Sequence, residues 1–192
     1  MTRETVFTIG HSTHSTTTFV GLLRQHEITA VGDVRSSPYS RFNPQFNRET
    51  LKRDLWASGI AYVFLGDELG ARRSEPECYD ADGRVLYDVA ARTTLFRQGL
   101  QRLRLGLQQH RIALMCAERD PIQCHRTLLI CRALRDGPEE ILHIRADGSA
   151  EPHAELEQRL LKRMKLPPTD LFADKDAMIL RAYDSRVQKR SS

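Results

Sequence analysis

The sequence predicts an α/β protein built on a single open, mostly parallel sheet of about five strands, with helices on both faces and a C-terminal appendage. Three observations support this class. Short apolar runs alternate with longer segments whose apolar residues recur at helical spacing, as in successive βαβ units. A length of 192 residues suits one such domain with some chain left over. The run "RIALMC" at residues 111–116 is apolar enough to lie in the centre of a sheet.

The chain opens with a strand, a helix and a second strand. Residues 5–10 ("TVFTIG") form the first strand. A helix over residues 15–27 follows, with Ser15 as its N-cap and apolar residues at i, i+3, i+4 and i+7 on one face. Residues 28–35 ("ITAVGDVR") return as the second strand, which completes one βαβ unit.

A polar loop with two prolines leads to the second helix. Asn47 can cap this helix, and Gly59 occupies the position at which a left-handed residue ends a helix. Residues 60–64 form the third strand. Residues 66–87 are rich in glycine and longer than most connections, so we expect a surface loop that is either functional or partly mobile.

The rest of the domain continues the alternation. The predicted elements are a long helix over 88–109, a fourth strand at 111–116, a helix over 124–136, a fifth strand at 140–144 and a helix over 154–165. The longest of these helices has leucines on its buried side and arginines elsewhere, which is typical of a helix packed on a sheet.

The chain changes character after residue 165. We expect the α/β domain to span residues 1–165 and a C-terminal tail to span 166–192, because "LPPTD" breaks the preceding helix. The tail contains one amphipathic stretch, whose apolar members are Met178, Leu180, Tyr183 and Val187. A loosely attached tail is favoured over a helix dedicated to a partner, because chain termini are commonly poorly ordered.

Composition narrows the classes of function. No apolar run approaches the roughly 20 residues of a bilayer span, so we expect a soluble protein without membrane contact. The N-terminal "MTRETVFTIG" lacks the features of a secretory signal, which predicts a cytoplasmic location. In that reducing compartment the four cysteines serve packing, metal binding or catalysis rather than disulfides. A net charge of +4 is compatible with anionic partners and does not demonstrate nucleic-acid binding.

Ligands of an open parallel sheet bind outside the carboxyl ends of its strands. Four polar segments follow predicted strands there, namely "GHSTH", "DVRSSPYSRFNPQF", "LGDELG" and "CAERDPIQCHR". The fold brings these segments together although they are far apart in the sequence. We therefore expect them to form one site.

The last of these segments carries the densest group of reactive side chains. Cys124, His125 and Arg126 lie at the predicted start of a helix, where the dipole and free N–H groups stabilise an anion. This setting lowers the pKa of Cys124 and makes it a nucleophile or a metal ligand at neutral pH. The alternative is a small buried cysteine in a helix-capping arrangement. For Cys116, at the end of the fourth strand, a packing role is at least as well supported.

Three other segments supply polar candidates. His11 follows Gly10 at the tip of the first strand and is a candidate acid, base or ligand, or a turn residue bonded to its neighbours. Asp33 and Arg35 point the same way from their strand, so they form an ion pair whose remaining donors can hold a phosphate or carboxylate. Glu118 can orient a neighbour or transfer a proton.

The loop after the second strand mixes polar and aromatic side chains. Its members are Ser37, Tyr39, Ser40, Arg41, Phe42, Asn43 and Phe46. Such a mixture suits stacking on a nucleotide or nucleic-acid base, and equally an ordered loop that packs its own aromatics. The remaining histidines, including His143 and His153, have weaker contexts and are expected in surface or packing roles.

The chain resembles the domain of unknown function 488 family in four motifs, which are "TIGHST" (8–13), "DVR" (33–35), "SPYSRFNPQF" (37–46) and "CAERDPIQCHR" (116–126). The resemblance spans about residues 5–145. It implies a compact α/β domain and little about activity, because the family is named for having no established one. The family's residues map onto His11, Ser12, Asp33, Arg35, Ser37, Pro38, Pro44, Phe46, Cys116, Glu118, Cys124, His125 and Arg126.

Of three functions, the one we favour is a cysteine-dependent hydrolase or transferase acting on a small anionic substrate that bears a phosphate or resembles a nucleotide. Cys124 is then the nucleophile, and His11 and Glu118 transfer protons. The substrate-binding residues are Ser12, Asp33, Arg35, Ser37, Cys116, His125 and Arg126.

The second function is a metal site built from Cys116, Cys124, and His125 or His11. The two cysteines are too far apart for a Cys-x2-Cys knuckle, so we expect no metal and no obligatory cofactor. The third is a non-catalytic module that binds a nucleotide or nucleic acid through the arginines and the aromatic loop. Unlike the first, it does not need Cys124.

Overall fold

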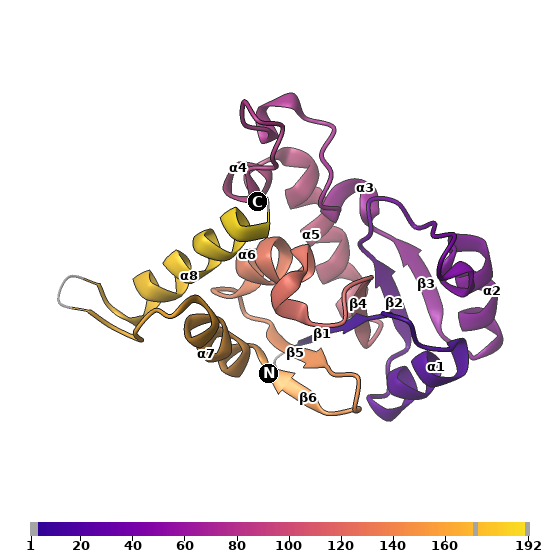
Figure 1. Cartoon of the computed structure of the whole chain (residues 1–192). Coiled ribbons are helices and arrows are strands. Elements are labelled where there is room, and N and C mark those ends of the chain that lie inside the picture. Colours follow the sequence, from indigo (N-terminus) through magenta and orange to yellow (C-terminus); the bar gives the residue numbers. More distant parts are fainter. Residues whose placement is uncertain (1–3, 171–172, 191–192) are drawn as a thin grey trace.

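The computed structural model describes residues 4–170 and 173–190 (Figure 1). Residues 1–3, 171–172 and 191–192 lie outside this described part, and with them portions of the N-terminal segment and of the tail predicted over 166–192. Among the described residues, the strands form one sheet in the order β3-β2-β4-β1-β5-β6. Their bounds are β1 Thr5–Gly10, β2 Ala30–Asp33, β3 Ala61–Phe64, β4 Ile112–Cys116, β5 Glu140–Ile144 and β6 Ala150–Pro152.

The sheet confirms the predicted fold class. Strands β1 to β5 pair in parallel, and each overlaps a strand expected from the sequence. Strand β6 pairs antiparallel with β5 and was not expected. Its three residues end in a proline and show no apolar alternation, so they carry no strand signal of their own.

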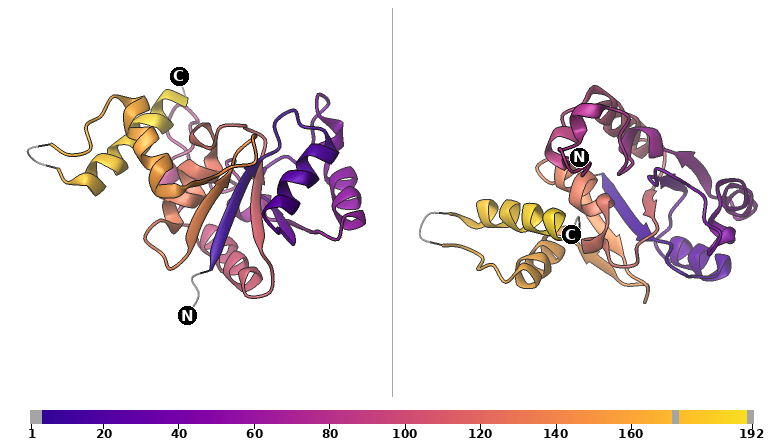
Figure 2. Two further views of the ribbon diagram at one scale, coloured as in Figure 1. Left: turned by 90° about the horizontal axis from the view of Figure 1, so that it is seen from below. Right: turned by 45° about the horizontal axis from the view of Figure 1, so that its top comes forward.

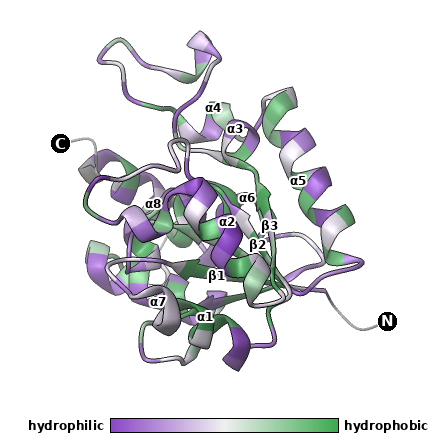
Figure 3. Cartoon of the chain, turned by 90° about the vertical axis from the view of Figure 1, so that its right-hand side faces the viewer, coloured by the Kyte–Doolittle hydropathy of each residue, from purple (hydrophilic) through white to green (hydrophobic). Residues whose placement is uncertain are grey.

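Helices cover both faces of the sheet, as predicted. Neighbouring residues of β1 point to opposite faces, and Val6 and Phe7 accordingly belong to different core clusters. The cluster around Phe7 lies under α1 (Thr16–Gln25) and α2 (Arg48–Ala57). The cluster around Val6 lies under α5 (Thr94–Leu107) and α7 (His153–Met164). In Figure 3, hydrophobic residues concentrate along β2 and β3.

Capping residues explain where several helices begin and end. Ser15 caps α1 by accepting a hydrogen bond from the Thr18 N–H at 3.1 Å, as predicted. Gly59 follows α2 with a φ of 76°, which also agrees with the sequence. The single helix predicted over 88–109 is wrong, because Thr93 caps a new helix. The chain therefore forms α4 (Tyr87–Ala90) and then α5.

The helix predicted over 124–136 has an unusual beginning. Residues Arg126–Cys131 form a π-helix, and only Arg132–Leu134 (α6) are α-helical. Such wide turns are rare and occur often at functional sites. Every residue of the π-helix is buried.

The loop predicted over 66–87 contains short elements of regular structure. It contains α3 (Gly66–Leu69), a 3-10 turn (Pro76–Cys78) and a bridge between Tyr79 and Val85. The buried Arg73 holds it together by donating to the Glu68 carbonyl at 2.6 Å and the Glu75 carboxylate at 2.8 Å.

The tail was expected to be loosely attached, but residues Lys175–Arg190 form α8, which lies beside α7 (Figure 1 and Figure 2). Met178 and Tyr183 of the predicted amphipathic stretch are buried, whereas Leu180 is exposed. Within the described residues, no helix combines the length and apolarity needed to cross a membrane.

Candidate thiol site

The carboxyl ends of three neighbouring strands, β2, β4 and β1, meet where the sequence predicted a site. Gly10 at the end of β1 stands beside Cys116 at the end of β4. The chain after Cys116 then crosses Gly10 so closely that a Cβ atom on Gly10 would lie 2.0 Å from the Glu118 carbonyl oxygen. The glycine allows this close approach, as the sequence suggested, and the crossing fixes Glu118 next to β1.

Cys116, Glu118, Cys124 and His125 form a group that we call the thiol cluster. The Cys116 thiol donates a hydrogen bond to Glu118 Oε2 at 3.0 Å. The Nδ1 atom of His125 lies 3.5 Å from the Cys116 sulfur and 3.8 Å from the Cys124 sulfur. Both cysteines and His125 are buried, so these contacts form away from bulk water.

The hydrogen bonds of His125 determine which nitrogen faces the sulfurs as an acceptor. Its Nε2 lies 2.9 Å from the carbonyl oxygen of Val34, which can only accept. Nε2 therefore carries a hydrogen, and in the neutral ring Nδ1 presents a lone pair to both sulfurs. His125 is thus oriented to accept a thiol proton or to bind a metal.

Arg126 brings a positive charge to the same place. Its side chain is fully buried, and its Nη1 and Nη2 atoms donate to the carbonyl oxygens of Glu118 and Arg119 at 2.8 and 3.4 Å. Its buried Nε atom has no hydrogen-bond partner among the described residues. A positive charge buried away from water needs a nearby anion. The Cys124 sulfur is close enough to serve, because the backbone N–H of Arg126 lies 3.5 Å from it.

The two cysteines of the cluster ionise differently. Burial raises the pKa of Cys116 well above the ordinary value of 9.0. Burial acts in the same direction on Cys124, but the neighbouring Cys116 thiol and the charge of Arg126 outweigh it and hold the pKa of Cys124 well below 9.0. The favoured arrangement is therefore a Cys124 thiolate beside a protonated Cys116.

Asp33 and Arg35 form the ion pair expected from their spacing. Arg35 donates two hydrogen bonds to the Asp33 carboxylate, from Nε to Oδ1 at 2.9 Å and from Nη2 to Oδ2 at 2.7 Å. The Tyr62 hydroxyl donates to Asp33 Oδ2 at 2.8 Å. Tyr62 was not expected at the site, because its place beside Val31, two residues before Asp33, depends on the register of β3. Both members of the pair are buried, and Arg35 also donates to the Phe46 carbonyl at 2.8 Å.

His11 is buried between this ion pair and the aromatic loop. Its ring stacks on Phe46 with centroids 4.3 Å apart. Its Nδ1 lies 2.9 Å from the Ser12 carbonyl oxygen, so that Nδ1 carries the hydrogen and Nε2 accepts from Arg35 Nη1 at 3.3 Å. Burial lowers the pKa of His11 to about 4, which keeps the ring neutral near pH 7.

Not every predicted residue joins the cluster. Ser12 follows His11 with a φ of 47°, and its N–H donates to the Ala117 carbonyl at 2.9 Å, so its backbone rather than its hydroxyl ties β1 to the segment after β4. Ser37 is exposed. In the same loop Phe46 is buried, whereas Tyr39 and Phe42 are 56% and 80% exposed.

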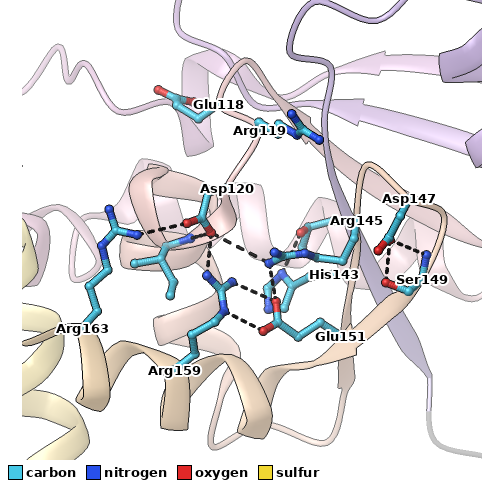
Figure 4. A network of polar contacts seen from close by, with 12 residues as sticks. Glu118, Arg119, Asp120, His143, Arg145, Asp147, Ser149, Glu151, Arg159 and Arg163 are labelled. Carbon is cyan, nitrogen blue, oxygen red and sulfur yellow. Dashed lines mark hydrogen bonds and ion pairs between the residues drawn. The ribbon is translucent and has the colours of Figure 1, made fainter.

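A pocket of about 460 Å³ opens beside Glu118. It is lined by Glu118, Arg119, Asp120, Gln123, Arg145, Ala146 and Asp147. Figure 4 shows the ion-pair network around Asp120, in which Arg159 bonds both Asp120 and Glu151. Arg145 directly follows β5, so the rule that ligands bind at the carboxyl ends of the strands also points to it. It was not selected because its segment "RADG" is typical of a simple turn.

The fold and the site define an α/β protein with a buried cysteine, histidine and arginine group at the carboxyl edge of a parallel sheet. The family model described as Domain of unknown function DUF488 matches residues 15–133, which is more than half of the chain. The chain therefore belongs to this family, and the predicted family is confirmed. No curated protein and no solved structure matches the chain. Because the family has no described activity, function is argued from the site.

Proposed function

We propose that the protein is a cysteine-dependent hydrolase or transferase with Cys124 as its nucleophile. The observation that carries the proposal is the buried Arg126, whose guanidinium Nη atoms donate to carbonyl oxygens and whose separate backbone N–H lies 3.5 Å from the Cys124 sulfur. This charge favours a thiolate at Cys124, and thiolates are the reactive form of cysteine. A reducing cytoplasm, our proposed location, suits four free cysteines.

The neighbouring residues suit the proton transfers of such a reaction. His125 Nδ1 faces both sulfurs and can take the Cys124 proton. Attack by the sulfur forms a covalent bond to the substrate as the leaving group departs, and water or an acceptor then breaks that bond. The proton that His125 took goes to the leaving group, and Glu118, which accepts from Cys116 and lines the pocket, is placed as the base that activates the water or acceptor. In this scheme the neutral His11 positions Arg35, and its own role in proton transfer stays a prediction.

The substrate we propose is a small anion that bears a phosphate or resembles a nucleotide. The pocket beside Glu118 carries Arg119 and Arg145, whose guanidinium groups bind phosphates and carboxylates well. Cys124 itself is fully buried, so segment 117–123, which connects the cluster to the pocket, has to move when the substrate binds. A nucleic-acid partner is less well supported, because Arg35 and Arg126 are buried rather than on the surface.

A metal centre is the second candidate, and one observation favours it. The ligand atoms of Cys116, Cys124 and His125 all lie within 4.8 Å of one another. The sulfur to nitrogen distances of 3.5 and 3.8 Å are close to the edges of a zinc tetrahedron with bonds of about 2.3 and 2.1 Å. The bond of His125 to Val34 also resembles the contacts that orient metal-binding histidines. The fold thus supplies the proximity that the sequence spacing did not suggest.

The test is a turnover screen of phosphorylated and nucleotide compounds with the wild-type chain, Cys124→Ser and the matched control Cys78→Ser. Cys78 is also buried and free but lies outside the cluster. We expect Cys124→Ser to remain folded and to lose turnover of any compound that the wild type and the control convert. Turnover retained by Cys124→Ser contradicts the nucleophile. Turnover that depends on added Zn²⁺ favours the metal centre.

A further inference from the structure

A second group of reactive side chains lies in the core away from the thiol cluster. It consists of Cys131, His143, His153, Glu157 and Tyr183, which come from the π-helix, β5, α7 and α8. All of them are buried. The sequence predicted only surface or packing roles for the two histidines, and the proposed reaction uses none of these residues. We call this group the histidine cluster.

The histidine cluster contains a chain of hydrogen bonds with one consistent direction. The Tyr183 hydroxyl donates to the Glu157 carboxylate at 3.1 Å, so the tyrosine oxygen accepts from His153 Nε2 at 3.0 Å. Nδ1 of the neutral His153 then accepts from His143 Nε2 at 2.9 Å. His143 Nδ1 in turn accepts from the Thr8 hydroxyl at 2.8 Å.

These bonds leave two nitrogens facing each other beside a thiol. His143 Nε2 and His153 Nδ1 share one hydrogen, and the Cys131 sulfur lies with them in a group whose ligand atoms are all within 4.8 Å. The outward nitrogens are held by Thr8 and Tyr183. Metal-binding histidines are typically oriented in this way, with one nitrogen toward the ion and the other bonded to a protein group.

We propose that Cys131, His143 and His153 bind a divalent transition-metal ion such as Zn²⁺ through Sγ, Nε2 and Nδ1. A thiolate and two imidazoles are ligands that Zn²⁺ accepts readily. On binding, Cys131 releases its proton. The hydrogen on His143 moves to Nδ1, from which it is donated to the Thr8 oxygen. Each bound ion therefore releases one proton, breaks the hydrogen bond between the two histidines and reverses the one between Thr8 and His143.

The structure also provides a route by which an ion can enter. A pocket of about 260 Å³ reaches His153, and its lining carries the carboxylates of Glu139, Glu140 and Glu157 against the single cation of Arg135. Two of the three ligands, His143 and His153, lie beyond residues 15–133. The proposed site therefore rests on this chain's own residues rather than on the family match. Because it shares no residue with the thiol cluster, it can be tested separately.

The test uses the full chain with the thiol cluster removed by Cys116→Ser and Cys124→Ser, prepared free of metal and titrated with Co²⁺. Thiolate-to-cobalt absorption in this background can come only from Cys131 or Cys78. We expect one equivalent of Co²⁺ to bind with that absorption and to release one proton. Adding Cys131→Ser abolishes the absorption, whereas adding Cys78→Ser leaves it unchanged. Failure of the folded double variant to bind Co²⁺, or absorption that survives Cys131→Ser, overturns the proposal.

If circular dichroism shows that the double variant does not fold, the wild-type chain decides. Long-range ¹H–¹⁵N spectra of its histidines are recorded before and after addition of Zn²⁺. We expect His143 Nε2 and His153 Nδ1 to take the shifts of metal-bound nitrogens and His143 Nδ1 to take that of a protonated one. Changes confined to His125, or no changes at all, mean that the histidine cluster is only a structural hydrogen-bond network.

Discussion

Arg126 lies fully buried beside Cys124, and a guanidinium removed from water destabilises the folded state unless an anion is near it. Cys116 is protonated and bonded to Glu118, so Cys124 is the cysteine left to carry the negative charge. The charge of Arg126 beside Cys124 would favour the thiolate whether Cys124 is a nucleophile or a metal ligand.

A double-mutant cycle on Cys124 and Arg126 measures this pairing. Cys124→Ser replaces the thiolate with a neutral hydroxyl and leaves Arg126 without its anion. We expect the free energy of unfolding to fall by about 1–3 kcal/mol while the chain stays folded. Adding Arg126→Met removes the unpaired charge and recovers part of that loss in denaturant titrations. The Cys78→Ser control, which unpairs no charge, shows no such coupling with Arg126→Met. Strictly additive losses for the Cys124 pair contradict the account.

Burial lowers the pKa of His11, His143 and His153, and the stability of the protein depends on pH through these histidines. The pKa of His11 falls from 6.5 to about 4 on folding because burial disfavours the charged ring. Between these values the unfolded chain binds more protons than the folded chain, so the free energy of unfolding decreases as pH is lowered from 6.5 to about 4. His11 alone contributes up to about 3 kcal/mol to this decrease.

Urea titrations at several pH values across this window measure the effect. His11→Gln should flatten the slope, because glutamine does not titrate. His110→Gln is the matched control, since His110 is exposed. Equal slopes for the wild type and His11→Gln would show that His11 is not the group that titrates.

At the residue scale, the sequence predicted the members of the site better than their roles. Cys116, Glu118, Cys124 and His125 do come together, because the rule for strand ends locates them without side-chain detail. The pairing of His125 with the Val34 carbonyl was not predictable, since it joins residues from separate strands through a rotamer. Ser37 was expected to bind substrate, but its side chain is exposed and its role stays a prediction.

At the scale of elements, the crossing of the segment after β4 over the end of β1 holds the site in place. Gly10 is where this crossing is tightest. A methyl group there would meet the Glu118 carbonyl at 2.0 Å and force the backbone of Glu118 and Arg119 to move.

Gly10→Ala therefore tests the crossing. We expect it to lower the free energy of unfolding by about 1–3 kcal/mol or more, as overpacking does. Gly21→Ala in α1 is the control, because a Cβ atom there meets nothing within 4 Å. It should stabilise the helix by about 0.5–1 kcal/mol. Thermal unfolding of both variants gives the comparison, and a Gly10→Ala variant as stable as wild type would show that the crossing can relax.

Helix α8 is attached through Tyr183, whose hydroxyl contacts both His153 and Glu157. Tyr183→Phe removes this hydroxyl and leaves buried polar groups without a partner, at an expected cost of about 1–3 kcal/mol in unfolding free energy. Tyr39→Phe is the matched control, because its hydroxyl bonds Glu49 at the exposed surface. It should change the stability by less than about 0.5 kcal/mol. Equal stability of the two variants would mean that the Tyr183 hydroxyl does not contribute to the docking of α8.

The elements differ in how far the sequence predicted them. Strands β1 to β5 were predicted because each is a distinct apolar run between polar segments. The break between α4 and α5 was missed because the apolar spacing continues through Thr93, and the cap alone marks the new start. The π-helix has no local signal in one sequence. The docking of α8 depends on contacts with α7 that no local pattern reveals.

At the scale of the whole molecule, the π-helix Arg126–Cys131 joins the two groups of reactive side chains. Cys124 stands just before it and belongs to the thiol cluster, whereas Cys131 ends it and belongs to the histidine cluster. The fold thus places the two clusters at the two ends of one buried segment, residues 124–131. The range matched by the family model, residues 15–133, includes the thiol cluster but not His143 and His153 of the histidine cluster.

The most direct test of the central claim is the pH dependence of alkylation of Cys124, resolved from the other cysteines by mass spectrometry on metal-free, folded protein. Burial makes the absolute rate slow, but the midpoint of its pH profile still reports ionisation of the thiol. We predict a midpoint for Cys124 well below 9.0, and midpoints for Cys116 and Cys131 above it. A Cys124 that reacts only at the pH of an ordinary thiol, or at no pH while the protein is folded, would contradict the thiolate and leave Cys124 as a packing residue.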